Sequence, residues 1–485
     1  MVADVREKNM RILFAASEAA PLVKVGGLAD VVSSLPDALI GLGHDVRIAI
    51  PGYGGINLNR ETATSVRDKF EVKLMDRSEA ATLRETRLNG KVPLYMIEND
   101  QYFGGKEIYT PNDLERFVFF SRAIFEMLHR LDWQPEVVHC HDWHTALLAM
   151  WLKKGNYPGA VIFTIHNLAY QGLFDDGFLH RSGLEQDWES HPAGAPKPPL
   201  NFLSQGILWA DLVTAVSESY AREIVTPERG EGLDPLLRFR QQDLRGITNG
   251  IDYAGYNPKT DQYLPVTFDE SSLERRLENK LALQAQANLP RNADIPLIGM
   301  VQRLDEQKGF DILGEAIDTI FQQTPAQLVI LGKGREHYEN MLRQLAAQYP
   351  QRLGVFIDFS EALARLIYGG ADMFLMPSRF EPCGLGQMIA MRYGALPIVR
   401  HTGGLIDTVP EITPDLKSGN GFVFHHYTPE ALITAVKKGV EAFGHRAAWR
   451  SAMRRVMGLD FSWRASALKY DAIYRETLEK KSSEM

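Results

Sequence analysis

The sequence MRILFAASE, residues 10–18, is closely followed by PLVKVGGLADVV, residues 21–32. The first stretch is an apolar run typical of a buried strand. The glycine pair in the second leads into LADVVSSLPDALIGLG, whose apolar spacing is typical of a helix. Another strand pattern, HDVRIAIP, comes next. A strand, a glycine loop, a helix and a second strand in this order indicate a parallel α/β sheet.

The same alternation begins again in the second half of the chain. There IPLIGMVQRLDEQKGF contains a strand and a loop, FDILGEAIDTIFQQ a helix, and QLVILGKG another strand. A chain of 485 residues is long enough for two or three domains. We therefore expect two Rossmann-like, doubly wound domains facing a central cleft, over residues 1–250 and 251–460. Residues 461–485 are expected to form a helix that packs back on the first domain.

Composition excludes several classes of protein. The net charge of −8 argues against a nucleic-acid partner, because phosphate backbones require a basic face. No apolar run approaches the ~18 residues of a membrane span. The start of the chain, MVADVREK, shows neither a signal peptide nor a transit peptide. Two cysteines among 485 residues fit a reducing compartment. We expect a cytoplasmic protein with neither a nucleic-acid nor a membrane partner.

The glycine loop after the first strand is a candidate ligand site. Ligands bind beyond the carboxyl ends of strands in open parallel sheets, where glycine lets the backbone approach closely. Lys24 adds a positive charge beside Gly26 and Gly27. The alternative is a tight turn with a surface lysine. The related stretch PIVRHTGGLIDTV, residues 397–409, is expected to serve mainly in packing, and a direct role at the site is left open.

Polar residues also end two later strands of the first half. VVHCHDWH, residues 137–144, resembles a metal site, but Cys140 points away from His139 and His141 in a strand. We therefore expect no metal there and interpret Asp142 as a polar group at the strand end. In TIHNLAYQG, residues 164–172, His166 and Asn167 can bind hydroxyls, although a lone histidine is commonly a packed core residue.

Two loops of the second half carry the charges expected at a diphosphate. Arg303 and Lys308 lie in QRLDEQKGF, residues 302–310, and suit a leaving group whose charge must be neutralised. A solvated basic loop is the alternative. In SRFEPCGLGQ, residues 378–387, we expect Pro382 to occupy the first turn of a helix. Glu381 at its start is interpreted as a ligand for sugar hydroxyls or as a simple cap, and Cys383 as a packed residue.

Taken together, the motifs K-x-G-G-L-A-D, H-D-W-H, H-N-x-A-Y-Q-G, N-G-I-D, R-L-x-x-Q-K-G and S-R-F-E-P-C-G-L resemble those of bacterial glycogen synthases and plant starch synthases. The resemblance extends in collinear order from Arg11 to about Tyr474. It implies the GT-B fold and a retaining glucosyltransferase without metal or cofactor. It also implies ADP-glucose as donor and the non-reducing end of an α-1,4-glucan, such as glycogen or a malto-oligosaccharide, as acceptor.

The resemblance assigns roles to individual residues. Lys24 matches the donor-binding lysine, Gly26 and Gly27 approach the phosphates and sugar, and Asp30 matches the aspartate of that motif. Asp142 and His166 match catalytic residues near the transferred glucose. Arg303 and Lys308 match the pair that stabilises the leaving group, and Glu381 matches the carboxylate that holds glucose hydroxyls. The remaining substrate-binding candidates are Asn167, Asn249, Phe359, Cys383, Gly384, Leu385 and Gly386.

Two of these positions depart from the family pattern. Gly386 stands where the family often has threonine, so only a backbone amide is offered there. Phe359 stands where tyrosine is common and can still stack on a base.

Three other functions are compatible with the sequence. The chain could be a same-fold transferase that uses UDP-glucose or another acceptor, or a silent glucan-binding or scaffold protein. It could also be a pyridoxal-phosphate phosphorylase, although the chain is short for one.

Overall fold

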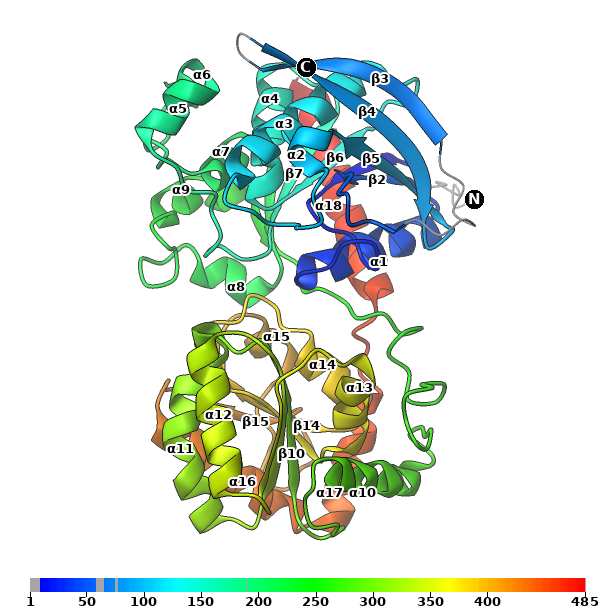
Figure 1. Ribbon diagram of the computed structural model, residues 1–485, viewed down its shortest axis with the longest axis vertical. Coiled ribbons are helices and arrows are strands. Elements are labelled where there is room, and N and C mark those ends of the chain that lie inside the picture. The colour runs from blue at the N-terminus through cyan, green and yellow to red at the C-terminus, as the bar shows by residue number, and fades with distance from the viewer. Residues whose placement is uncertain (1–8, 58–64, 75–76, 190, 485) are drawn as a thin grey trace, which may run out of the picture. The chain divides into compact units, whose positions relative to one another are not determined.

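The computed structural model describes residues 9–57, 65–74, 77–189 and 191–484. Residues 1–8, the region in which we looked for a leader peptide, lie outside the described residues. The chain divides into two compact units. Unit 1 comprises Met1–Gly250 and Trp463–Met485, and unit 2 comprises Ile251–Ser462. Each unit is built around one sheet with helices packed against it (Figure 1).

The sheet of unit 1 has the strand order β3-β4-β5-β2-β1-β6-β7-β8-β9. Neighbouring strands are parallel from β5 to β9, and β4 is antiparallel to both β3 and β5. The strands are β1 (Arg11–Ala15), β2 (Asp45–Pro51), β3 (Ser65–Leu74), β4 (Arg77–Leu88), β5 (Val92–Glu98), β6 (Val137–His141), β7 (Ala160–Ile165), β8 (Leu212–Ala215) and β9 (Leu244–Gly246).

Strand β1 lies between β2 and β6, so the chain winds outward from it in both directions. This is the point in a doubly wound sheet where ligand sites form, beyond the carboxyl ends of the strands. Every residue of β6 and of β7 is buried, as expected for central strands covered on both faces. The prediction of a parallel α/β sheet is confirmed for this unit.

Helices cover both faces of this sheet. A side chain at Gly206 on α7 would meet the ring of Phe163, whereas Tyr474 on α18 bonds His139, which bonds Thr164. Phe163 and Thr164 are consecutive in β7, so α7 and α18 lie on opposite faces. The helices of unit 1 are α1 (Gly27–Gly41), α2 (Asp100–Phe103), α3 (Asp113–Leu128), α4 (Ala146–Lys154), α5 (Asp176–Ser182), α6 (Glu185–Glu189), α7 (Phe202–Trp209), α8 (Glu218–Glu223), α9 (Asp234–Phe239) and α18 (Trp463–Glu484).

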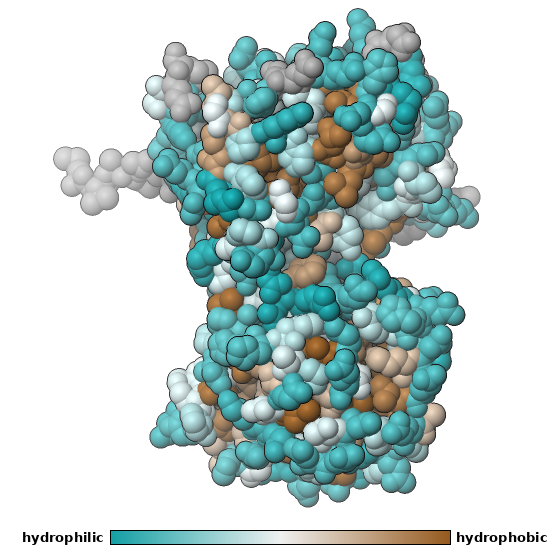
Figure 2. Space-filling model, turned by 90° about the vertical axis from the view of Figure 1, so that its left-hand side faces the viewer, coloured by the Kyte–Doolittle hydropathy of each residue, from teal (hydrophilic) through white to brown (hydrophobic). Residues whose placement is uncertain are grey.

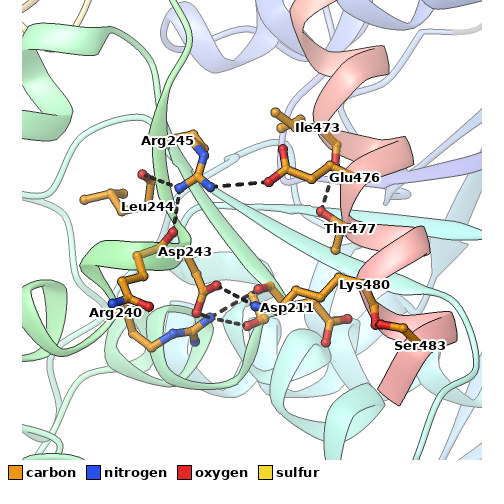
Figure 3. Close-up of polar contacts among 12 residues, drawn as sticks. Asp211, Arg240, Asp243, Leu244, Arg245, Ile473, Glu476, Thr477, Lys480 and Ser483 are labelled. Atoms are coloured by element: carbon orange, nitrogen blue, oxygen red, sulfur yellow. Dashed lines mark hydrogen bonds and ion pairs between the residues drawn. The ribbon is translucent and has the colours of Figure 1, made fainter. Parts of the chain in front are cut away.

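Helix α18 comes after unit 2 in the sequence but belongs to unit 1. Figure 3 shows its charged residues facing β9 and the turn before it: Lys480 Nζ lies 3.0 Å from Asp243 in the turn, and Glu476 lies 3.5 Å from Arg245 in the strand. Further along the helix, Asp471 lies 3.0 Å from Nε2 of the buried His44. Helix α18 therefore packs on the sheet of unit 1.

Unit 2 contains a parallel sheet with the order β12-β11-β10-β13-β14-β15. Figure 1 shows this sheet between a layer that includes α11 and α12 and a layer that includes α10 and α13. Its strands are β10 (Leu297–Val301), β11 (Gln327–Leu331), β12 (Leu353–Phe356), β13 (Met373–Met376), β14 (Leu396–Arg400) and β15 (Phe422–Phe424). Its helices are α10 (Arg276–Gln286), α11 (Phe310–Gln323), α12 (Glu336–Gln348), α13 (Glu361–Gly370), α14 (Gly386–Arg392), α15 (Gly404–Thr408), α16 (Pro429–Phe443) and α17 (Arg446–Met457).

Hydrophilic residues predominate on the surface shown in Figure 2. The large apolar side chains that remain exposed include Val25, Tyr170, Leu173 and Phe359. Within the part of the chain that the structure describes, no helix is both long and apolar enough to cross a membrane.

Asp211 helps to hold α18 on unit 1, so replacing it should lower the stability of the fold. Its carboxylate accepts hydrogen bonds from the Val161 amide at 2.8 Å, from Lys481 at 3.2 Å and from Lys153. Burial alone would raise the pKa of Asp211, but these bonds outweigh burial and lower it. We expect Asp211→Asn to reduce the free energy of unfolding by about 2 kcal/mol at pH 7, the usual size for hydrogen bonds to a charged group.

The pH dependence is set by the direction of this shift. A carboxyl with a lowered pKa stabilises the fold above its unfolded pKa of about 3.9, and this contribution is lost as pH falls through the folded value. In urea unfolding, the difference in free energy of unfolding between wild type and variant should therefore become smaller below about pH 4. An equal difference at pH 7 and pH 3 would contradict this. Asp294→Asn is the control, because that side chain is 88% exposed.

Candidate functional site

The carboxyl edge of the unit 1 sheet collects the polar residues that the sequence pointed to. Beyond β1 the chain passes through Glu18 to the glycine loop, where Lys24 forms an ion pair of 2.7 Å with Asp30. Gly27 begins α1, and Gly26 stands just before it. A side-chain carbon built on either glycine would meet nothing within 4 Å. The loop therefore presents open backbone, as expected where a ligand approaches closely.

Glu18 holds this loop in place, a role that the sequence analysis missed. Its Oε2 accepts the backbone amides of Val25 at 2.6 Å and Gly26 at 3.0 Å. The hydroxyl of Tyr109 donates to Oε1 at 2.5 Å. Burial and the neighbouring carboxylate raise the pKa of Tyr109, so this hydroxyl keeps its proton and remains a donor. An acidic residue shortly after a buried strand was a visible signal, but nothing in the sequence indicated its partner Tyr109.

Asp142 and His166 lie together at the ends of β6 and β7. The Asp142 carboxylate accepts the backbone amide of His166 at 2.7 Å. Its backbone has φ +55°, which L residues other than asparagine and aspartate seldom adopt and which often marks a functional position. Burial raises the pKa of Asp142 to about 7, against the backbone hydrogen bonds that lower it. Burial therefore favours the protonated form of this carboxyl more than in a free aspartate.

The other unit 1 candidates are Asn167, which follows β7, and Asn249, which follows β9. Asn167 accepts the Ala169 amide at 3.1 Å through its side chain. Asn249 is buried, and within the described part of the chain its Oδ1 has no hydrogen-bond partner.

The stretch that resembles a metal site in the sequence is buried at His139, Cys140, His141 and His144. No group of three or more histidine, cysteine or acidic side chains among the described residues is placed to hold a metal ion.

In unit 2, the central contact is an ion pair between Lys308 and Glu381. The Lys308 ammonium lies 2.6 Å from Oε2 of Glu381, and both side chains are largely buried. The Ser378 hydroxyl donates to the same oxygen at 2.9 Å. Among the described residues nothing donates to Oε1, so one face of this carboxylate stays open. Both charges were predicted from the sequence, but their contact was not.

Backbone contacts hold the loops that carry these two residues against each other. The Arg379 amide donates to the Gln307 carbonyl at 2.8 Å, and the Gln307 side chain donates to the Phe380 carbonyl at 3.3 Å. A side-chain carbon on Gly309 would lie 2.1 Å from the Pro377 carbonyl oxygen. Only glycine permits this approach, which explains the glycine directly after Lys308.

The prediction of a helix beginning at Pro382 is wrong. Helix α14 begins at Gly386, and Leu385 is the residue before it. Gly384 has φ +73°, which a right-handed helix cannot contain, so Pro382–Leu385 form a turn instead. Gly386 has little room for a larger residue, because a side-chain carbon there would lie 3.0 Å from the Phe374 ring.

The remaining unit 2 candidates differ in exposure. Arg303 lies 3.4 Å from Asp305 on its own loop, with 44% of its side chain exposed. Phe359 is 74% exposed, so its ring is accessible to a ligand. Cys383 is buried, and Gly384 and Leu385 are half-buried in the turn after Glu381. The roles of all these residues stay predictions.

Comparisons with known proteins assign this chain to a family. Residues 11–239 match the family described as starch synthase catalytic domain, and residues 284–456 match the group 1 glycosyl transferases. A glycogen synthase of Desulforudis audaxviator is 44% identical, over 99% of this chain and 98% of the relative. One of Gloeobacter violaceus is 46% identical, over 97% and 99%. The chain belongs to the glycogen synthase family.

A solved structure supports the same assignment. The catalytic domain of starch synthase IV from Arabidopsis thaliana, bound to ADP and acarbose, is 32% identical with a TM-score of 0.88, covering 97% of this chain and 100% of that one. The enzyme is therefore a GT-B glycosyltransferase, a glucosyltransferase of glycogen or starch synthesis. The resemblance and the fold class predicted from the sequence are confirmed.

The two glycine pairs of this glycogen synthase homologue differ in their surroundings. Gly26 and Gly27 have open space beside them, whereas Gly403 and Gly404 pack against backbone. Gly403 has φ +47°, and a side-chain carbon there would lie 2.0 Å from the Glu381 carbonyl oxygen. The Gly404 amide donates to that carbonyl at 3.0 Å. The second copy therefore supports the Glu381 turn through backbone contact.

This contrast predicts that two matched substitutions both lower activity but that only one of them lowers stability. Gly403→Ala should reduce the free energy of unfolding by about 1–3 kcal/mol and lower activity, because the Glu381 turn must move. Gly26→Ala should leave stability within about 0.5 kcal/mol of wild type, because its φ is −139° and the space is empty, while activity falls at the open loop. Denaturant unfolding with rates of glucose transfer tests both. Wild-type stability in Gly403→Ala would overturn the assignment.

Proposed function

We propose that this enzyme transfers glucose from ADP-glucose to the non-reducing end of an α-1,4-glucan with retention of anomeric configuration. The observation that carries the proposal is the buried Lys308–Glu381 pair, which sets an ammonium and a half-open carboxylate side by side. An ammonium has three donors, so Lys308 can hold Glu381 and still donate to a phosphate oxygen. The open Oε1 of Glu381 suits a sugar hydroxyl.

The choice of ADP rests on the starch synthase IV structure, which is bound to ADP and acarbose. In the proposal, unit 2 binds the nucleotide sugar, with Phe359 stacking on the base and the turn from Cys383 to Gly386 beside the donor. Unit 1 binds the glucan acceptor, and its loop of Lys24, Gly26 and Gly27 approaches the phosphates and sugar. The reaction is placed in the cytoplasm, in keeping with a chain of only two cysteines.

The proposed mechanism is a displacement on one face of the sugar. Arg303 and Lys308 draw negative charge onto the departing ADP, and the glucosyl carbon becomes oxocarbenium-like. The acceptor hydroxyl forms the new glycosidic bond from the face that ADP leaves, and a β-phosphate oxygen takes its proton. Asp142, His166, Asn167 and Asn249 position the transferred glucose. The proposal assigns no step to a metal or cofactor.

The donor assay tests the function directly. Initial rates of labelled glucose transfer into glycogen should be much higher with ADP-glucose than with UDP-glucose. A preference for UDP-glucose would keep the reaction type and overturn the donor assignment. Glucan binding without transfer from either donor would overturn the function and favour a binding protein.

Lys308 provides a second test. We expect Lys308→Ala to lower kcat about 10²–10³-fold, by analogy with the ~3–4 kcal/mol lost when one oxyanion donor is removed. Lys417→Ala is the control, because that lysine is 84% exposed and pairs only loosely with Asp415. Lys417→Ala should retain the wild-type unfolding midpoint. Lys308→Ala leaves Glu381 buried without its cation and should lose about 3–5 kcal/mol of stability, so its kcat is measured below its own unfolding midpoint. An unchanged kcat in folded Lys308→Ala would refute the role of this cation.

A further inference from the structure

A cluster of buried histidines lies behind His166. His139 and His141 alternate along β6 and so project from the same face of the sheet. Their ring centroids are 4.1 Å apart, and the ring of Phe14 stacks on His141 at 5.2 Å. Nδ1 of His141 lies 2.9 Å from Nε2 of His166. The site described above gives His141 no task, although it is in direct contact with a candidate catalytic residue.

A hydrogen bond between two imidazoles requires that one ring donate and the other accept. Burial lowers the pKa of His141 well below its usual value, with help from the neighbouring histidines, and burial lowers the pKa of His166 to about 3. Both rings are therefore neutral at pH 7. A neutral imidazole has one N–H and one acceptor nitrogen, so a single choice of donor fixes the proton position on both rings.

The second ring nitrogen of His141, Nε2, decides which of the two histidines donates the hydrogen bond. Nε2 of His141 is buried and, within the described residues, has no hydrogen-bond partner. If His166 donated, the proton of His141 would have to sit on Nε2 as a buried N–H without an acceptor, an arrangement that is rare and costly in proteins. If His141 donates from Nδ1, Nε2 carries only a lone pair, and no N–H is buried without an acceptor.

We propose that His141 is a positioning residue that donates from Nδ1 to Nε2 of His166 and thereby holds His166 in the tautomer protonated at Nδ1. The Nδ1–H of His166 then meets no acceptor among the described residues of the chain. Because the His166 side chain is only partly covered by protein, this N–H is offered to a ligand. Only the identity of that ligand, a sugar hydroxyl oxygen, rests on the proposed function.

Helix α18 fixes the second layer of this arrangement. Nδ1 of His139 lies 2.7 Å from the Tyr474 hydroxyl, and Nε2 lies 2.5 Å from Oγ1 of Thr164. With both nitrogens bonded, the His139 ring cannot rotate, and it forms a rigid wall against His141. The position of His141 thus depends on the last helix of the chain.

The tautomer can be observed without any substrate. We would label histidine with ¹⁵N in the full chain and record long-range ¹H–¹⁵N correlations, assigning His166 by comparison with His166→Gln. The expected pattern at pH 7 is a protonated Nδ1 and an unprotonated Nε2. A protonated Nε2, or averaging between the two tautomers, would overturn the proposal even if glucose transfer were confirmed.

Two variants separate positioning from packing. His141→Phe keeps a ring in contact with Phe14 and His139 but removes the donor, whereas His141→Asn places an amide N–H near the position of Nδ1. His141→Phe should let the His166 tautomers average and lower kcat about tenfold, the usual scale of one hydrogen bond. His141→Asn should restore the wild-type tautomer and most of the activity.

The control is His129→Phe, which removes an exposed histidine that bonds the Phe125 carbonyl on α3. It should leave the His166 signals and kcat unchanged. A wild-type His166 tautomer in His141→Phe would refute the role of His141. If neither ADP-glucose nor UDP-glucose gave transfer in any variant, the tautomer data would still decide whether His141 positions His166. A failure of this proposal can therefore be distinguished from a failure of the proposed function.

Discussion

Parallel strand pairing is the constraint on which both sites depend. In a parallel sheet all carboxyl ends meet at one edge, so residues remote in sequence become neighbours without any direct signal between them. In unit 1 this brings Glu18, Asp142 and His166 to the ends of β1, β6 and β7. In unit 2 it brings Lys308 and Glu381 to the ends of β10 and β13. The chemistry of each unit is therefore set by residues in the loops that follow a few buried strands.

In unit 2, close contacts between backbones fix the positions of the loops that carry Lys308 and Glu381. The Lys308 loop touches the Glu381 loop at Gly309, and the second glycine pair touches the same loop at Gly403. Three loops are thus stacked with no side chain between them at these points. Such an arrangement holds a buried ion pair at fixed geometry, and it leaves the Glu381 carboxylate little freedom to turn away from Lys308.

The sequence allowed the strands and long helices to be predicted, because their apolar spacing is a local property. The helix over residues 310–323 was predicted with its exact bounds. The charged candidates were also identified, since charge directly after an apolar strand is visible in one dimension. The start of α14 was predicted wrongly because Pro382 is compatible with either a helix or a turn, and the left-handed conformation of Gly384 decides between them. Tyr109 gave no signal, and His141 stood out only in a motif that resembles a metal site. The contacts that give them importance span 91 and 25 residues of sequence.

The placement of α18 has a consequence for biosynthesis. Unit 1 begins with the first residues of the chain but is completed only by Trp463–Met485. Until Tyr474 leaves the ribosome, the buried His139 lacks the hydroxyl that bonds its Nδ1, and His44 lacks Asp471. Unit 2 is contiguous and can fold while unit 1 still waits for its last helix. A chain interrupted near its end would therefore carry a finished unit 2 beside an unfinished unit 1, so that one late segment commits the whole molecule to activity.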